Sequence, residues 1–326
     1  MRKLRSYALG AAILAAALVL AACGSGGSDS GDDTGDSGGG GGSGASASPA
    51  SEMVLGGPPE CPDRPFCIPG LEETYGIEFQ EFKPLDVGGP LTVQALENGQ
   101  IDVGLLFSTS SVIVANDWVV LEDDKNLQTA ENITPVVNAE SNDETIETLL
   151  NSVSAALTTE NVTELNGRVE IDKETPADVA QTFLEEEGIS GDGESGSGDL
   201  TVGAVQFAEN QIVAEMYAQV LEQAGYTVDR QLDLGSREII QPAIKKGEID
   251  IAPEYLGSLL LFLDPDAEAT GDPQNNIDLL TPLLEESNAV LLEPSEANDT
   301  NAFVVTRETA DEHGLASMSD LAGSGE

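Results

Sequence analysis

The sequence predicts an α/β protein of two lobes, each built around a mainly parallel sheet. From residue 51 onward, strand-like and helix-like segments alternate, which is the pattern of parallel strands connected by helices. A Gly/Ser/acid stretch, SGDGESGSGD at 190–199, divides this region into two parts, and one block of more than 20 residues occurs once in each part. The region has about 275 residues, which is enough for two lobes with cores of their own.

Residues 1–22 have the features of a targeting segment. A positive start with three Arg or Lys residues is followed by an apolar run from Ala8 to Ala22. This combination predicts a secretory signal, and the run is short for a helix that spans a bilayer. Leu20-Ala21-Ala22-Cys23 resembles the lipobox of bacterial lipoproteins, which implies lipidation of Cys23. The alternative is a plain signal peptide with an unrelated cysteine.

Residues 23–50 are rich in Gly, Ser and Asp and contain almost nothing that could be buried. Such a composition predicts a flexible, solvated tether. The same reasoning makes residues 189–198 a flexible linker.

Two further cysteines, Cys61 and Cys67, enclose a short loop that contains prolines. An exported chain meets an oxidising environment, so a disulfide is expected here. The alternative, a metal site, needs more ligands, and the only histidine of the chain, His313, is distant in sequence. We therefore predict no metal site and no cofactor.

The formal net charge of the chain is −46. A surface of this charge repels nucleic acid, so DNA and RNA are excluded as partners. It also disfavours anionic ligands outside a locally basic pocket.

The second part of the chain begins with a regular alternation of elements. A strand is expected at 200–205, and the helical spacing of apolar residues in 209–225 predicts a helix that Gly225 ends. A strand at 226–234, a helix at 236–247 and a strand at 248–255 follow.

The first part repeats this order. The block EFKPLDVGGPLTVQALENGQIDVGLLF parallels RQLDLGSREIIQPAIKKGEIDIAPEY, so Gly99 corresponds to Gly247 and Ile101-Asp102-Val103 to Ile249-Asp250-Ile251. The shared content is a strand, a glycine before a helix, a glycine after it and a buried strand. Two such units predict two lobes of similar build.

These residues resemble the glycine betaine/choline-type substrate-binding proteins of ABC importers. The signals are Phe207-x-Glu209 after a strand, a helix that ends in Ala-Gly-Tyr (224–226), and Gly-Glu-Ile-Asp…Pro-Glu-Tyr-x-Gly at 247–257. PSEANDTNAFVVTRETADEHGLASMSDLA (294–322) resembles the segment that crosses into the second lobe. The resemblance implies a two-lobe, periplasmic-binding-protein-like fold of type II with a hinge.

The order of the segments differs from that of the family, in which the segment like 199–322 precedes the segment like 52–188. We therefore expect a circular permutation. The domain prediction has lobe II at 51–106 with 294–322, and lobe I at 107–188 with 199–293, joined by the 189–198 linker. A linker of this length is able to connect neighbouring termini.

The resemblance also implies a ligand between the lobes, below the loops that follow the strands. Aromatic faces hold a quaternary ammonium by cation–π attraction. Tyr255 resembles a cage tyrosine of the family, and Phe107 takes the matching place in the other copy. The predicted ligand-binding residues are Tyr255, Phe107, Phe207, Phe66, Asn301, Gln206, Ser108 and Thr109.

The chain departs from the family where choline-type members carry tyrosine, at Asn301, and where they often carry aspartate, at Ser110. A thinner cage leaves room for a more polar or zwitterionic solute. A carboxylate would be received by Arg237 or by the backbone N–H groups at the helix starts near Gly88 or Gly235.

The function predicted from these observations is an extracytoplasmic, lipid-anchored and monomeric receptor. It binds glycine betaine, choline or a related osmolyte and delivers it to the ABC permease subunits. The alternatives are a receptor for a different polar solute and a tethered protein that kept the fold but lost its ligand. An enzyme is not expected, because one histidine and a Cys pair without a companion His form no catalytic cluster.

Overall fold

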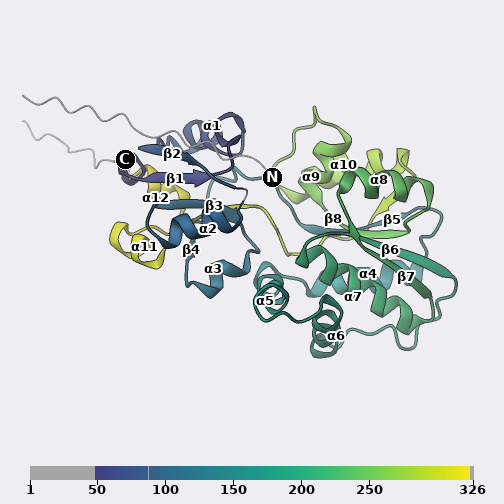
Figure 1. Ribbon diagram of the computed structural model, residues 1–326. Coiled ribbons are helices and arrows are strands. Elements are labelled where there is room, and N and C mark those ends of the chain that lie inside the picture. Colours follow the sequence, from purple (N-terminus) through teal and green to yellow (C-terminus); the bar gives the residue numbers. More distant parts are fainter. Residues whose placement is uncertain (1–47, 87, 324–326) are drawn as a thin grey trace, which may run out of the picture. The chain divides into compact units, whose positions relative to one another are not determined.

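The structure, a computed structural model, describes residues 48–86 and 88–323, and it contains two five-stranded sheets (Figure 1). The predicted signal segment, the lipidation site Cys23 and the tether up to residue 47 lie outside the described residues. Within the described ranges, we find no helix with the length and apolar character that a membrane crossing requires.

The lobe that contains the first sheet is lobe II, and its strand order is β2-β1-β3-β10-β4. The strands are β1 (Val54–Gly57), β2 (Glu81–Pro84), β3 (Val103–Phe107), β4 (Val119–Val120) and β10 (Asn301–Val305). Its helical segments are η1 (Pro49–Glu52), η2 (Cys61–Asp63), α1 (Ile68–Gly70), η3 (Leu71–Tyr75), α2 (Pro90–Glu97), α3 (Ser111–Ala115), α11 (Arg307–His313) and α12 (Met318–Ala322). One apolar cluster joins the sheet to η1, η3, α11 and α12, and another joins it to α2 and α3. The sheet is therefore buried on both faces.

Lobe I contains the second sheet, with the order β7-β6-β8-β5-β9. The strands are β5 (Ile133–Asn138), β6 (Asp199–Val205), β7 (Thr227–Leu234), β8 (Ile251–Tyr255) and β9 (Ala289–Leu291). Its helices are α4 (Glu144–Ala156), α5 (Thr159–Glu170), α6 (Pro176–Glu187), α7 (Ala208–Ala224), α8 (Arg237–Lys246), α9 (Leu256–Leu263) and α10 (Pro273–Glu286). The apolar cluster on one face of this sheet includes α4 to α7, and the cluster on the other face includes α8 to α10.

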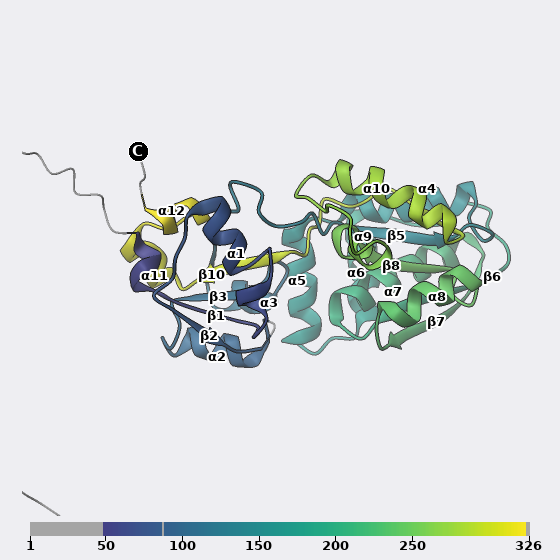
Figure 2. The ribbon, with the colours of Figure 1, turned by 90° about the horizontal axis from the view of Figure 1, so that it is seen from above.

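The two sheets have the same connectivity. In each, the second strand of the order (β1 or β6) has a parallel neighbour on both sides. The next strand along (β3 or β8) then pairs antiparallel with a strand that arrives from the other lobe, β10 or β5. Figure 2 shows the two sheets from above. The predicted two-lobe α/β fold is confirmed.

The Ile-Asp pair of the repeated block has the same role in both lobes. The Asp102 carboxylate accepts a hydrogen bond from the backbone N–H of Val54 in β1 at 2.8 Å. The Asp250 carboxylate accepts one from the N–H of Thr201 in β6 at 2.7 Å. Each aspartate therefore joins the loop after a helix to the first half of β1 or β6.

The isoleucine of each pair packs against a glycine of the same strand, β1 or β6. A Cβ added to Gly56 would lie 2.5 Å from Ile101 Cδ1, and one added to Gly203 would lie 2.9 Å from Ile249 Cδ1. A larger residue at either glycine would displace the isoleucine, because such distances are below van der Waals contact.

The structure differs from the predicted lobe boundary in one segment. Residues 107–127 were assigned to lobe I, but β4 pairs with β10 in the sheet of lobe II, and Leu121 and Leu127 pack into the core of that lobe. The chain reaches the sheet of lobe I only at β5. The apolar residues on both sides of the short β4 keep this segment with lobe II.

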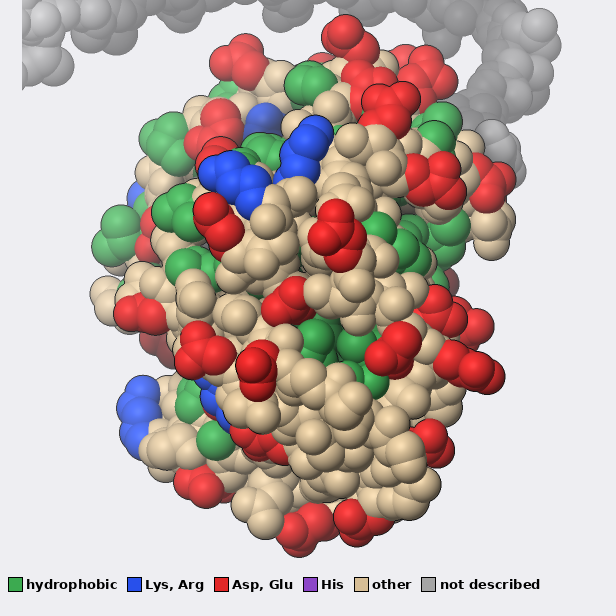
Figure 3. Space-filling view, turned by 90° about the vertical axis from the view of Figure 1, so that its right-hand side faces the viewer, with side chains coloured by type: hydrophobic (Ala, Val, Ile, Leu, Met, Phe, Trp, Pro, Cys, Tyr) green, Lys and Arg blue, Asp and Glu red, His purple; other side chains and the backbone are tan. Residues whose placement is uncertain are grey.

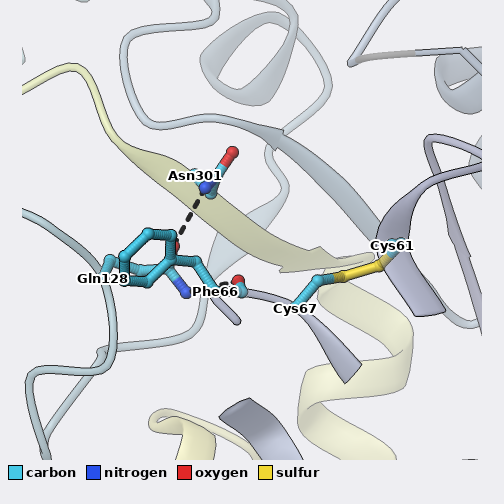
Figure 4. The surroundings of a disulfide bond; sticks show 5 residues. All are labelled: Cys61, Phe66, Cys67, Gln128 and Asn301. Atoms are coloured by element: carbon cyan, nitrogen blue, oxygen red, sulfur yellow. Dashed lines mark hydrogen bonds between the residues drawn. A yellow bond between two sulfur atoms is a disulfide. The ribbon is translucent and has the colours of Figure 1, made fainter. Parts of the chain in front are cut away.

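The predicted disulfide between Cys61 and Cys67 is present. It closes the loop that carries Phe66, next to β10 (Figure 4). Asp and Glu side chains are spread over the face of the molecule drawn in Figure 3, with few Lys or Arg among them.

Candidate ligand-binding site

A pocket of about 780 Å³ lies between residues of the two lobes. Lobe II contributes Gly88, Phe107, Thr109 and Ser110 from the ends of β3 and the start of α2. Lobe I contributes residues that follow β6 and β8 and that begin α7 and α8. The carboxyl ends of parallel strands meet at one edge of a sheet, so both sheets direct their loops to this place.

One wall of the pocket is aromatic. The rings of Phe207 and Tyr255 are stacked, with centroids 6.1 Å apart and an interplanar angle of 28°. Phe207 ends the turn after β6 and is 44% exposed, whereas Tyr255 ends β8 and is only 8% exposed. Phe107, from lobe II, lines the same pocket and is 37% exposed. Two exposed ring faces and one buried ring are therefore available to a bound group.

The interior of the pocket contains a buried acid, Glu209, in the first turn of α7. The Tyr255 hydroxyl donates to Glu209 Oε1 at 2.7 Å, and Asn166 Nδ2 donates to Glu209 Oε2 at 3.3 Å. Burial raises the pKa of Glu209 to about 8, and the nearby charge of Asp299 acts in the same direction.

Asp299 is the second acid of this group and belongs to the segment that leads into β10. Its Oδ1 accepts a hydrogen bond from the Thr109 hydroxyl at 2.7 Å. Burial raises the pKa of Asp299 as well. Asn166 Nδ2 also donates to the carbonyl of Thr109 at 3.1 Å, so Thr109 connects both acids to lobe II.

The one Arg or Lys among the described residues that line the pocket is Arg237, at the start of α8. Its Nε and a terminal guanidinium nitrogen lie 2.9 and 2.8 Å from Glu254 Oε2. Gln241 Nε2 donates to the other oxygen of Glu254 at 2.7 Å. The positive charge of Arg237 is therefore already paired inside the protein.

A smaller cavity of about 170 Å³ adjoins the pocket and shares Phe107, Ser258 and Asp299 with it. Phe66 and Asn301 line this second cavity and not the larger pocket. Gln128 holds both residues, since its Nε2 donates to the Phe66 carbonyl and its Oε1 accepts from Asn301 Nδ2, each at 3.0 Å (Figure 4).

The structure thus brings together five of the eight residues predicted from the sequence. Tyr255, Phe107, Phe207, Gln206 and Thr109 line the larger pocket. The side chain of Ser108 instead bonds to the backbone of the crossing segment, because its hydroxyl donates to the Asn298 carbonyl and accepts from the Thr300 N–H.

Sequence reasoning did not select Glu209, Asp299, Asn166 or Gln128 for the site. Glu209 was noted only as part of a motif. An acidic residue two positions after an aromatic residue at a helix start was the one available signal, since Asp299 and Asn166 come from distant segments. In the described part of the chain, no group of three or more His, Cys, Asp or Glu is placed to hold a metal ion.

Residues 45–186 and 198–326 match the family described as substrate binding domain of ABC-type glycine betaine transport system. This is most of the chain, and it confirms the resemblance found in the sequence. The family consists of substrate-binding domains, which agrees with the expectation that the chain is not an enzyme.

Three curated relatives show local similarity. The chain is 31% identical over 124 residues to the glycine betaine-binding protein YehZ of Escherichia coli, which covers 37% of this chain and 41% of the relative. It is 33% identical over 156 residues to the glycine-betaine-binding protein of Pseudomonas aeruginosa, which covers 47% and 50%. The carnitine transport binding protein OpuCC of Listeria monocytogenes is 29% identical over 117 residues, which covers 35% and 37%. The alignments span half or less of the length of these relatives.

Solved structures show distant likeness. An ancestral arginine-binding protein bound to arginine aligns with a TM-score of 0.36 and 12% identity, over 83% of this chain and 89% of that one. The periplasmic VFT2 domain of Bordetella pertussis BvgS aligns with a TM-score of 0.36 and 11% identity, over 84% and 86%.

Proposed function

Because the chain belongs to the family of substrate-binding domains of ABC-type glycine betaine transport systems, we propose that it is an extracytoplasmic solute receptor. It binds a quaternary ammonium compound in the pocket between its lobes and delivers it to the permease subunits of an ABC importer. The curated relatives are named for binding glycine betaine or carnitine, both of which carry a quaternary ammonium group.

The single observation that carries this proposal is the combination of aromatic rings and acids in one pocket. A quaternary ammonium cannot donate a classical N–H hydrogen bond, so a protein holds it with aromatic faces and nearby negative charge. The aromatic component consists of the stacked rings of Phe207 and Tyr255 and of Phe107 from lobe II. Glu209 and Asp299 supply the acids.

Hydrogen bonds at the pocket connect the two lobes. Thr109 of lobe II bonds to Asp299, and Asn166 of α5 bonds to both Thr109 and Glu209. A ligand that contacts these residues would favour one arrangement of the lobes, and a permease could respond to that arrangement. A lipid on Cys23 and the tether would keep the receptor, as a monomer, close to the membrane.

We also propose that the chain is circularly permuted relative to its family. The family match stops at residue 186 and resumes at 198, which supports a junction in the linker. In lobe II, the Ser48 hydroxyl donates to the Leu321 carbonyl at 2.6 Å, and α12 packs against η1. Residues 322 and 48 could therefore be joined directly, as the family order requires.

The proposed function is tested by isothermal titration of the purified chain with choline, glycine betaine, carnitine and proline betaine. Saturable binding of at least one is expected. Phe207→Ala should weaken that binding, whereas Leu279→Ala, which removes an exposed apolar side chain from α10, should leave it unchanged. If a cooperatively folded chain binds none of the four, the proposal fails. A receptor for another solute, or a protein that kept the fold without a ligand, would then remain.

A further inference from the structure

The pocket contains two carboxyl groups and an amide oxygen that has no hydrogen-bond donor. Glu209 and Asp299 are carboxyl groups; Glu209 is 3% exposed, and Asp299 is half-buried. Asn166 is 5% exposed and lines the same pocket. Among the described residues, no donor reaches Asn166 Oδ1, although its Nδ2 is bonded to Thr109 and Glu209. A buried acceptor without a partner is unfavourable, so this atom indicates a place for a donor on the ligand.

The positive side chain that a ligand carboxylate would need, Arg237, is already paired with Glu254. Arg237 lies on Glu254 with two nitrogens, and Gln241 completes the hydrogen bonds of that carboxylate. A carboxylate that took Arg237 would leave Glu254 buried without its partner, which is costly. Arg237 is therefore unsuited to receive an anion in this arrangement.

Two helix starts at the pocket are also closed to an anion. At α2, the Asp86 carboxylate accepts the N–H groups of Leu91 and Thr92, each at 2.9 Å. At α8, hydrogen bonds from the Ser236 hydroxyl and from the N–H of Glu238 itself lower the pKa of the Glu238 carboxyl. Each start thus has a carboxylate of its own, where a ligand carboxylate would otherwise bind.

The third helix start at the pocket is that of α7, and no side chain caps it. Its first turn carries Glu209, which in its ionised form would repel a second carboxylate at this position. In the part of the chain that the structure describes, the pocket therefore offers a ligand carboxylate no free cationic partner.

We propose that the pocket selects a monocationic quaternary ammonium alcohol, such as choline, over a zwitterion that ends in a carboxylate, such as glycine betaine. This inference rests on the proposed function and names the substrate class of the same site. The ammonium lies against Phe207 and Tyr255, and the hydroxyl donates to Asn166 Oδ1 or to one of the two acids. The selectivity differs from that in the names of the curated relatives.

The test is a pair of titrations of the purified full chain in a nonionic detergent, one with choline and one with glycine betaine. At about pH 7.5, choline should bind at least about tenfold more tightly, since a carboxylate here meets acids and no free cation. Binding of glycine betaine that equals or exceeds that of choline would overturn the inference and leave the proposed function standing. Absence of binding by every quaternary ammonium tested would instead refute the proposed function.

Two variants test whether the two acids cause the preference for choline. Asp299→Asn and Glu209→Gln should each reduce the ratio of choline affinity to glycine betaine affinity several-fold. The matched controls are Asp278→Asn and Glu185→Gln, which change acids on the exposed side of α10 and α6. An unchanged ratio in variants that unfold cooperatively would contradict the inference.

A pH series of the unaltered chain keeps the test decisive if a variant does not fold. Choline and glycine betaine keep the same charge across neutral pH, so any change in their affinity comes from the protein. Asp299 and Tyr255 are the titratable groups that directly shift the pKa of Glu209, and the charge of Glu170 raises the pKa of Asp299. The preference for choline should increase from about pH 6.5 to about pH 8.5 as Glu209 ionises. A constant or decreasing preference would contradict the inference.

Discussion

The hydroxyl of Tyr255 donates a hydrogen bond to Glu209 Oε1 at 2.7 Å, and this contact joins the aromatic wall of the pocket to its buried acid. The ring of Tyr255 stacks with Phe207 on one side of the contact. On the other side, Glu209 Oε2 accepts a hydrogen bond from Asn166 Nδ2. An ammonium on these rings would therefore lie close to Glu209, whose ionisation depends on the hydrogen bonds that it accepts.

Tyr255→Phe should weaken ligand binding while it retains the ring. The hydroxyl lowers the pKa of Glu209, so its loss leaves the acid more fully protonated and less attractive to a cation. We expect choline affinity to fall by about 1 kcal/mol at about pH 7.5, measured by calorimetry. Tyr226→Phe is the matched control, because its hydroxyl bonds to Asp143 away from the pocket. Equal effects of the two changes would contradict this role.

Phe207→Ala and Phe107→Ala should each reduce affinity by about 1–2 kcal/mol. Both rings are more than one-third exposed, so the melting temperature of the unliganded protein should change little. Thermal unfolding and titration of the same samples separate the two effects. A loss of stability that accounts for the whole loss of binding would assign these rings to packing instead.

Glu209 should make the unliganded protein less stable at alkaline pH. Its pKa is about 8 in the folded protein, above the ordinary value of 4.5 that it regains on unfolding. The folded state therefore binds this proton more tightly. The resulting stabilisation is complete below about pH 4.5 and is lost as the pH rises through about 8, by at most ~1.4 kcal/mol per pH unit.

Denaturant unfolding of the unaltered chain and of Glu209→Gln at several pH values checks this predicted loss of stability with rising pH. The free energy of unfolding of the unaltered chain should fall more steeply between about pH 5 and about pH 8.5 than that of the variant. Glu185→Gln, an exposed change on α6, should keep the steeper slope. Parallel curves for all three proteins would show that Glu209 does not titrate in this window.

The repeated aspartates should stabilise their lobes in the same way. Asp102→Ala and Asp250→Ala each leave a strand N–H, of Val54 or Thr201, without its acceptor, and should lower the free energy of unfolding by about 1–3 kcal/mol. Asp250→Ala should have the larger effect, because Asp250 also accepts the hydroxyl of Ser141. No destabilisation by either change would contradict the shared role of the two copies.

Restoring the family order should preserve the fold. A rearranged chain would begin at residue 198, run to 323, continue from 48 and end at 188, with the linker removed. The contact between Ser48 and Leu321 indicates that the new junction needs no change of lobe II. Circular dichroism and ligand titration should match those of the unaltered chain. A rearranged chain that does not fold would argue against the permutation.

Much of the fold followed from local patterns. The helix of residues 208–224 and the left-handed Gly225 and Gly247 were predicted from apolar spacing and from glycine placement. The repeated block identified two lobes of equal connectivity, because the Ile-Asp pair makes the same short-range contact in each. Residues 107–127 were assigned to the wrong side, since a two-residue strand such as β4 has too short a pattern to identify its sheet.

The site was less predictable than the fold. Aromatic residues that follow strands could be selected, because their place at the sheet edge depends on local order. Asp299 and Glu209 are 90 positions apart in the sequence, and only the packing of β10 beside β3 brings Asp299 to Thr109. Phe66 and Asn301 were expected in the same pocket, but Gln128 holds them at the adjacent cavity.

The most direct measurement is a crystal structure of the protein with choline. We predict that the ammonium lies within about 6 Å of the ring centroids of Phe207 and Tyr255, with the hydroxyl directed toward Asn166 and the two acids. A choline molecule bound outside this pocket, or a complex in which Phe207 and Tyr255 do not contact the ligand, would contradict the account.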